Sequence, residues 1–263
     1  MLQIATIDAF TDQPFKGNPA GVCITDTPLP VEMMQNIAAE LNLSETAFVV
    51  PIGEAKWSLR WFTPAVEIEL CGHATLASAH RLFEQRLVAS DTLLRFQTLS
   101  GELTARKVGD KIELDFPAIV VAPFEPQAEV IKALGIAPIH SRRKGLFTLF
   151  EFESNQVVRE LAPDLKSMVE QGFGKFVVTA RSENPKYDLV SRFFAPGAGI
   201  DEDPVTGSAH CVLAPFWAEK LSKNILHCYQ ASKRGGELEV ELRGDRVLMR
   251  GHAVTVMKGD LLV

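Results

Sequence analysis

The feature that most constrains the fold is an internal repeat with a spacing of 135 residues. Gly72 begins the run GHATLASAH, and Gly207 begins the similar run GSAH 135 residues later. Glu67 and Glu202 each lie five residues ahead of these glycines. RWFTP at residues 60–64 is echoed by RFFAP at residues 192–196. GEL occurs at residues 101–103 and again at 236–238, and GD occurs at 109–110 and again at 244–245. Two related halves are therefore predicted, each with one helix that begins at a glycine.

The length of the chain agrees with two domains of moderate size. At 263 residues, one large domain or two smaller ones are possible, and the repeat favours two. The proline-marked stretch 117–126 is the predicted crossing between them. We therefore expect an N-terminal half over residues 1–117 and a C-terminal half over residues 118–263.

The local patterns predict an α+β fold. Alternating apolar and polar residues predict many short strands, several joined by hairpin signals such as Gly109-Asp110. The helices at Gly72 and Gly207 are rich in small and apolar residues, so each is predicted to be covered by an antiparallel sheet that curls around it. Pro215 lies inside the second of these helices and predicts a kink or an early end there.

Composition and charge exclude several classes of function. The net charge is −6 and the Lys and Arg residues are scattered, which argues against nucleic acid and against anionic membrane surfaces as partners. Four separated cysteines indicate free thiols in a reducing compartment. The N-terminus lacks the pattern of a signal peptide, and no apolar run has membrane-spanning length. We expect a soluble, cytoplasmic protein.

The two helix starts are candidate anion sites. The first backbone N–H groups of a helix lack intrahelical partners, and glycine lets an anion approach them closely. If both starts face one cleft between the halves, amides near Gly72 and Gly207 would hold a small carboxylate from two sides. The alternative is that these glycines only permit tight strand-to-helix turns.

Several segments resemble the PhzF-like family of phenazine biosynthesis: GNPAG, SETAFV, RWFTP, CGHATLASAH, RFFAPGAGIDEDPVTGSAH and QASKRGG, from residue 17 to about 236. The family is related to diaminopimelate epimerase and proline racemase. The resemblance implies two pseudo-symmetric domains, each a barrel-like sheet wrapped around a central helix, with the active site between them. It also implies an isomerase with no cofactor and no metal, often a homodimer.

The resemblance implies four active-site residues. The acid/base glutamate of the family falls on Glu45 in SETAFV, and other active-site positions fall on His73, Asp203 and Ser208. Glu45 heads a strongly apolar strand, as a partly desolvated general base would. Asp203 is a candidate to orient His73 or to hold a ligand amine or hydroxyl, or it only initiates a turn.

Two further residues are weaker candidates. Asn18 in GNPAG is placed to reach the substrate, although a turn role suffices. Cys71 matches the first of the two cysteines that related racemases use, but Thr206 replaces the second, so packing is the favoured role for Cys71. The histidines form no HExxH motif and no zinc spacing with cysteine, so no metal site is predicted.

The sequence supports one main hypothesis and two alternatives. The main hypothesis is a cofactor-independent isomerase that moves a proton on a small carboxylate-bearing metabolite, with Glu45 as acid and base. The alternatives are a thiol-dependent epimerase or racemase that uses Cys71, and a non-catalytic binding protein on the same fold. The sequence does not name the substrate.

Overall fold

The computed structural model describes all 263 residues, and the chain divides into two compact units. The first unit contains residues 1–116 and 248–263, and the second contains residues 117–247. The prediction gave residues 118–263 to the second half, so the return of the C-terminal segment to the first unit is a difference. Its cause is strand β18 (Ala253–Leu261), which pairs antiparallel with β1 (Leu2–Ala9) along its length.

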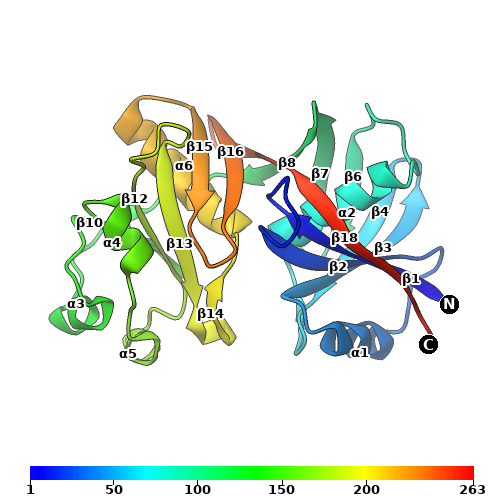
Figure 1. Ribbon diagram of the computed structural model, residues 1–263, viewed down its shortest axis with the longest axis horizontal. Coiled ribbons are helices and arrows are strands. Elements are labelled where there is room, and N and C mark those ends of the chain that lie inside the picture. The colour runs from blue at the N-terminus through cyan, green and yellow to red at the C-terminus, as the bar shows by residue number, and fades with distance from the viewer. The chain divides into compact units, whose positions relative to one another are not determined.

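The first unit is a sheet that surrounds the helix α2 (Gly72–Glu84) (Figure 1). Its other elements are β2 (Asn18–Ile24), α1 (Val31–Leu41), β3 (Glu45–Gly53), β4 (Lys56–Phe62), β5 (Glu67–Ile68), β6 (Leu94–Thr98), β7 (Gly101–Val108) and β8 (Lys111–Pro117). Neighbouring strands pair in the order β18, β1, β2, β3, β4, β6, β7, β8, and β5 adds to β4.

The second unit repeats this order around α6 (Gly207–Leu221). Its other elements are β9 (Ala122–Pro123), α3 (Ala128–Leu134), β10 (His140–Lys144), β11 (Phe147–Glu151), α4 (Asn155–Glu160), α5 (Leu165–Glu170), β12 (Phe176–Arg181), β13 (Leu189–Ala195), the short 3₁₀ helix η1 (Pro196–Ala198), β14 (Ile200–Asp203), β15 (Ile225–Gln230) and β16 (Gly236–Arg243). β17 (Arg246–Gly251) crosses the boundary between the units.

Both sheets are mostly antiparallel, and each has two parallel pairings at matching places. β2 pairs parallel with β3 and β11 with β12, because helices lie between these strands along the chain. β4 pairs parallel with β6 and β13 with β15, because the central helices α2 and α6 form those crossovers. The α+β class with a sheet wrapped around one central helix per half is confirmed.

The central helices are largely enclosed because most of their residues are small or apolar. In α2, Ala74, Ala77 and Ala79 are fully buried, so strands approach the helix from several directions. Its buried hydroxyls bond within the helix: Ser78 Oγ donates to the Ala74 carbonyl oxygen at 2.7 Å. The buried Ser78 hydroxyl therefore needs no hydrogen-bond partner outside the helix.

Pro215 does not end α6, so the predicted early end is wrong. The helix continues to Leu221. A proline at position 215 cannot donate to the Cys211 carbonyl oxygen one turn earlier. The backbone N–H of Ile119 donates to that oxygen instead, at 2.9 Å, from the stretch that follows β8. The missing helix bond is replaced, which removes much of the cost of the proline.

No helix of the chain combines the length and the apolar character needed to cross a bilayer.

Candidate active site

Glu45 and His73 meet in the first unit, where β3 begins and α2 begins. Glu45 Oε2 lies 3.1 Å from His73 Nε2, and the two side chains are only 12% and 6% exposed. The atoms are at ion-pair distance but are not aligned as a hydrogen bond, and neither has another hydrogen-bond partner. Two buried polar atoms without an aligned partner are unusual in folded proteins and are typical of sites that complete their bonding with a ligand.

Asn18 holds the other edge of the His73 ring. Asn18 Nδ2 lies 3.2 Å from His73 Nδ1, and Ser44 Oγ donates to Asn18 Oδ1 at 3.4 Å. In neutral His73, an amide that donates to Nδ1 leaves the ring proton on Nε2, facing Glu45; in the imidazolium form both ring nitrogens are donors. The imidazolium form also carries a proton on Nε2. In both states His73 therefore presents an N–H towards Glu45.

The backbone before Asn18 requires glycine. Gly17 has φ of +63°, and a Cβ there would lie 2.1 Å from the Ala9 carbonyl oxygen. Only glycine fits such a left-handed turn against a backbone atom. The GNPAG motif thus delivers Asn18, which is fully buried, to the start of β2 beside His73.

Cys71 belongs to the same cluster. It is the N-cap residue of α2, and its Sγ lies 3.5 Å from His73 Nδ1. Burial raises the pKa of the Cys71 thiol, and the negative charge of Glu45 raises it further. The thiol is therefore protonated near neutral pH. The prediction placed Cys71 in packing, and the structure places it in packing and in contact with a candidate catalytic ring.

The pKa of His73 is raised well above its ordinary value. Burial acts in the opposite direction, because it disfavours the imidazolium, but negative charge at Cys71 and Glu45 outweighs it. The contribution of Cys71 requires its thiolate; while the thiol is protonated, the Glu45 carboxylate alone opposes the effect of burial. Glu45 and His73 thus form a buried pair in which the carboxylate favours the protonated ring.

The donor types at this cluster also suit a metal ion. Ligand atoms of Glu45, Cys71 and His73 lie within 4.8 Å of one another. However, the two ring nitrogens face different partners: Nδ1 faces Cys71 and Asn18, and Nε2 faces Glu45. An ion bound to one nitrogen at about 2 Å would not use the side chain on the other edge of the ring at the same time. Proton transfer between the partners fits this arrangement better than coordination.

Both central helices begin without a side-chain cap. Cys71 and Thr206, the two N-cap residues, have extended backbones, and neither side chain bonds to a first-turn N–H. Gly72 and Gly207 are the first helical residues. The orphan N–H groups of each first turn therefore remain available to an anion or to water.

In the second unit, Asp203 and Thr206 are held by Gln230 at the end of β15. Gln230 Oε1 accepts from the Thr206 backbone N–H at 2.9 Å, and its Nε2 donates to the Asp203 carbonyl oxygen at 2.8 Å. Thr206 Oγ1 donates to Asp203 Oδ2. Ser208 is half-buried on the first turn of α6. The loop that carries Asp203 into α6 is thereby fixed from the neighbouring strand.

The approach to each central helix is braced by the same ion pair. Arg60 on β4 forms a two-pronged pair with Glu67 on β5, at 2.6 and 2.7 Å. Arg192 on β13 forms the matching pair with Glu202 on β14, at 2.7 and 3.0 Å. Each guanidinium also stacks over the phenylalanine two residues later, at 5.3 and 4.8 Å. The repeated arginines and glutamates of the sequence therefore form the same ion pair in both units.

Comparison with known proteins identifies the family. The profile of the phenazine biosynthesis-like proteins, PhzC-PhzF, matches residues 7–259. The chain belongs to this family. Among curated PhzC-PhzF relatives, it is 48% identical to an uncharacterized isomerase of Halalkalibacterium halodurans, over 99% of this chain and 98% of that protein. It is 40% identical to the human phenazine biosynthesis-like domain-containing protein, over 99% of each chain.

Solved structures of the PhzF family share the fold along the whole chain. A PhzF family protein of Enterococcus faecalis superposes with a TM-score of 0.95 at 39% identity, covering 100% of this chain and 99% of that one. A hydroxyproline epimerase of Agrobacterium vitis superposes with a TM-score of 0.61 at 13% identity, covering 98% and 91%. That second likeness is one of fold alone, and it confirms the predicted epimerase-like architecture.

The structure brings together Asn18, Glu45, Gly72 and His73 in the first unit, and Asp203, Gly207 and Ser208 around the start of α6 in the second. That all of them serve one substrate stays a prediction. The sequence did not predict that Ser44 would bond Asn18 or that Gln230 would hold Asp203 and Thr206. Gln230 begins the QASKRGG motif, which contributed to the resemblance but suggested no role by itself.

Proposed function

We propose that this chain is a cofactor-independent isomerase that moves a proton on a small carboxylate-bearing metabolite, with Glu45 as general acid and base. One observation carries the proposal: buried Glu45 Oε2 and His73 Nε2 lie 3.1 Å apart without a hydrogen bond between them. A carboxylate in that state is ready to take a proton from a substrate carbon. Relatives at 45–48% identity are described as isomerases, which agrees with this class.

In the proposed mechanism, the substrate carboxylate binds the uncapped N–H groups at the start of α2. Glu45 removes a proton from a carbon that is activated by conjugation, and it delivers the proton to a second carbon of the same substrate. The Nε2–H of His73 stabilises the Glu45 carboxylate before the transfer and after it. Asn18 keeps the ring oriented for this role through Nδ1.

We assign the second unit a role in substrate binding. Asp203 would accept from a ligand hydroxyl or amine, and Ser208 would donate to its carboxylate. Asp203→Asn and Ser208→Ala are then expected to raise KM more than they lower kcat, because neither residue moves the proton. Equal loss of kcat and kcat/KM would place them in the chemical step instead.

A thiol-dependent epimerase is the second candidate, favoured by the 3.5 Å contact between Cys71 Sγ and His73 Nδ1. Two facts oppose it: the Cys71 thiol has a raised pKa, and Thr206 occupies the matching place in the second unit. Loss of solvent-deuterium exchange at a substrate α-carbon in Cys71→Ser, with exchange retained in Glu45→Gln, would support the thiol mechanism.

The test is incubation of the protein with a library of small carboxylates in D₂O, followed by NMR. Incorporation of deuterium that depends on Glu45 and not on Cys71 supports the proposal and identifies the exchanged carbon. Tight binding of a cyclic carboxylate without any exchange supports a non-catalytic binding protein. The homodimer that the family resemblance implies is a separate proposal, which light scattering tests against a protomer of 28.9 kDa.

A further inference from the structure

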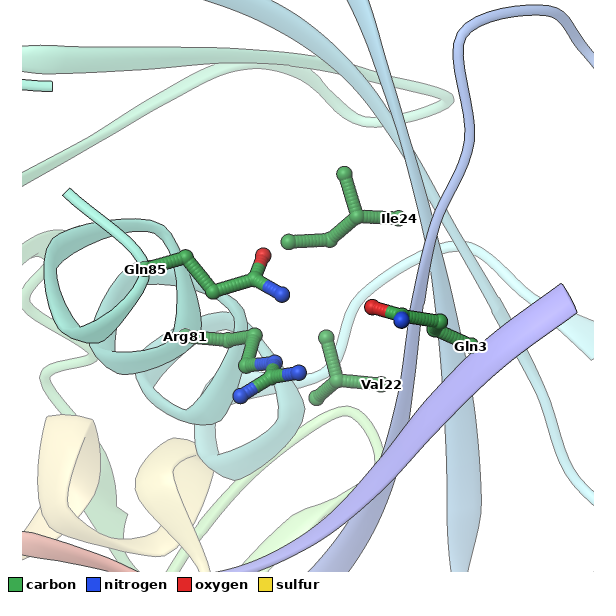
Figure 2. A pocket seen from close by; sticks show the side chains of 5 residues that line it. All are labelled: Gln3, Val22, Ile24, Arg81 and Gln85. Carbon is green, nitrogen blue, oxygen red and sulfur yellow. The ribbon is translucent and has the colours of Figure 1, made fainter. Parts of the chain in front are cut away.

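A small cavity opens in the first unit at the far end of α2 from His73. It has a volume of about 130 Å³ and is lined by Gln3 on β1, Val22 and Ile24 on β2, and Arg81 and Gln85 at the end of α2. Figure 2 shows the polar ends of Gln3, Arg81 and Gln85 converging beside the two apolar side chains. Eight residues of helix separate Arg81 from His73, so the cavity lies about 12 Å from the candidate active site.

Arg81 is the unusual member of this cavity because it is a buried charge. The residue is 6% exposed, although arginine is seldom buried unless it is fully paired. One guanidinium nitrogen, NH1, bonds Glu84 at 2.7 Å. Arginine offers five N–H donors in a planar fork, so a single carboxylate leaves donors unused. The cavity is where a second acceptor would meet them.

The charge around the cavity is positive. Glu84 is shared between Arg81 and Lys258, whose Nζ lies 3.0 Å from it. The pKa of His80, on the same helix, responds to these charges. Burial lowers its pKa, Glu84 raises it, and Lys107, Arg81 and Lys258 each lower it. The net effect is a lowered pKa, of which burial is the largest cause and to which the three cations add.

Size and lining define the ligand. The volume of about 130 Å³ has room for a small molecule and not only for a single water molecule. The planar fork of Arg81 matches a planar carboxylate, and the carboxamides of Gln3 and Gln85 supply further donors. Val22 and Ile24 offer an apolar wall to a short alkyl group. We propose that this cavity is a binding site for a short-chain monocarboxylate, separate from the candidate active site.

The test uses the full-length protein labelled with ¹⁵N-arginine and sodium acetate as the probe. The Arg81 Nε signal, assigned with Arg81→Lys, is expected to move saturably with acetate and to remain still with sodium chloride at equal ionic strength. Arg81→Gln should raise the dissociation constant by about tenfold or more, since it removes a charge-assisted bond. Absence of a saturable shift, or an equal shift with chloride, would overturn the proposal.

Two further variants keep the test decisive if Arg81→Gln does not fold. Gln3 is exposed and Gln85 is half-buried, so the Gln3→Leu and Gln85→Leu variants are both expected to fold. Each should weaken acetate binding several-fold and leave the Arg81 signal in place. Arg95→Gln is the matched control, because Arg95 pairs with Glu102 on the surface of the same unit. If Gln3→Leu and Gln85→Leu bind acetate as tightly as Arg95→Gln does, the proposed cavity is not the site.

Discussion

His73 Nε2 lies 3.1 Å from Glu45 Oε2, so a residue of the α2 start and a residue of the β3 start face each other in a buried place. Parallel pairing of β2 with β3 aligns Ala20 with Glu45, and this places Asn18, two residues before Ala20, near the same ring. The cluster of Asn18, Glu45 and His73 is therefore built from three segments that are far apart in the sequence. It is the geometry from which the proposed chemistry follows.

The Glu45 carboxylate should control the protonation of His73. In the folded wild type, the pKa of His73 lies well above its ordinary value, and Glu45→Gln should lower it because one of the negative groups that oppose burial is removed. A histidine-selective NMR titration measures both values. Glu40→Gln, an exposed substitution in the same unit, is the control. An unchanged pKa of His73 in Glu45→Gln would show that the pair is not coupled.

The same pair predicts a pH-dependent stability. A raised pKa in the folded state contributes stability that is full below the unfolded value of about 6.5 and is lost as pH rises through the folded value. Glu45→Gln should therefore lower Tm more at pH 6 than at pH 9, by thermal unfolding. An equal loss of Tm at the two pH values would contradict this sign.

The Arg60–Glu67 pair should stabilise the approach to α2 beyond the value of an ordinary surface pair. Both side chains are partly exposed, at 30% and 22%, but the contact is two-pronged. A double-mutant cycle with Arg60→Ala and Glu67→Ala should give a coupling of about 1 kcal/mol in the free energy of unfolding. The exposed pair Arg95–Glu102 serves as the reference, and its coupling should be smaller.

Gln230 should be necessary for the order of the Asp203 loop. Gln230→Leu would leave the Thr206 N–H and the Asp203 carbonyl without their present partners, at a cost of about 1 to 3 kcal/mol for each buried group. Chemical denaturation should therefore show a loss of a few kcal/mol. Gln171→Leu, on an exposed side chain of the same unit, should have little effect. Comparable losses in the two variants would refute the bracing role.

His210 should make the protein sensitive to acid. Burial lowers its pKa to about 4, although the hydrogen bond from Nδ1 to the Thr206 carbonyl oxygen, at 2.8 Å, acts in the opposite direction; Nε2 is buried without a partner. The unfolded chain binds a proton near pH 6.5, so stability falls as pH falls from there to about 4, by on the order of 3 kcal/mol.

His210→Gln should flatten that part of the pH profile, and the exposed His227→Gln should not. Equal profiles for the wild type and His210→Gln would show that His210 does not govern acid unfolding.

The repeat predicts the central helices well, because the many small and apolar residues of α2 and α6 favour burial against a surrounding sheet. It does not predict that β18 returns to β1, since pairing between chain ends leaves no local pattern. The same limit applies to Gln230, whose role depends on a loop 24 residues earlier. Glu45 and His73 were predicted separately from motifs, but their contact follows only from the parallel register of β2 and β3 and the position of α2.

Pro215 shows a different limit. An interior proline predicts a break because it removes one helix bond, and that reasoning is correct for the helix alone. The Ile119 N–H supplies the missing donor from outside the helix. A tertiary contact of this kind is invisible to a local pattern, so of the predicted kink or early end, the early end does not occur.

The most direct test of the account is the rate of solvent-deuterium exchange on the substrate found in the carboxylate library, compared between wild type and Glu45→Gln. General acid/base catalysis contributes about 10² to 10⁴ in rate, so the variant should lose exchange by that factor while it still binds the substrate. Exchange at the wild-type rate in a correctly folded Glu45→Gln protein would contradict the assignment of Glu45 as the acid and base.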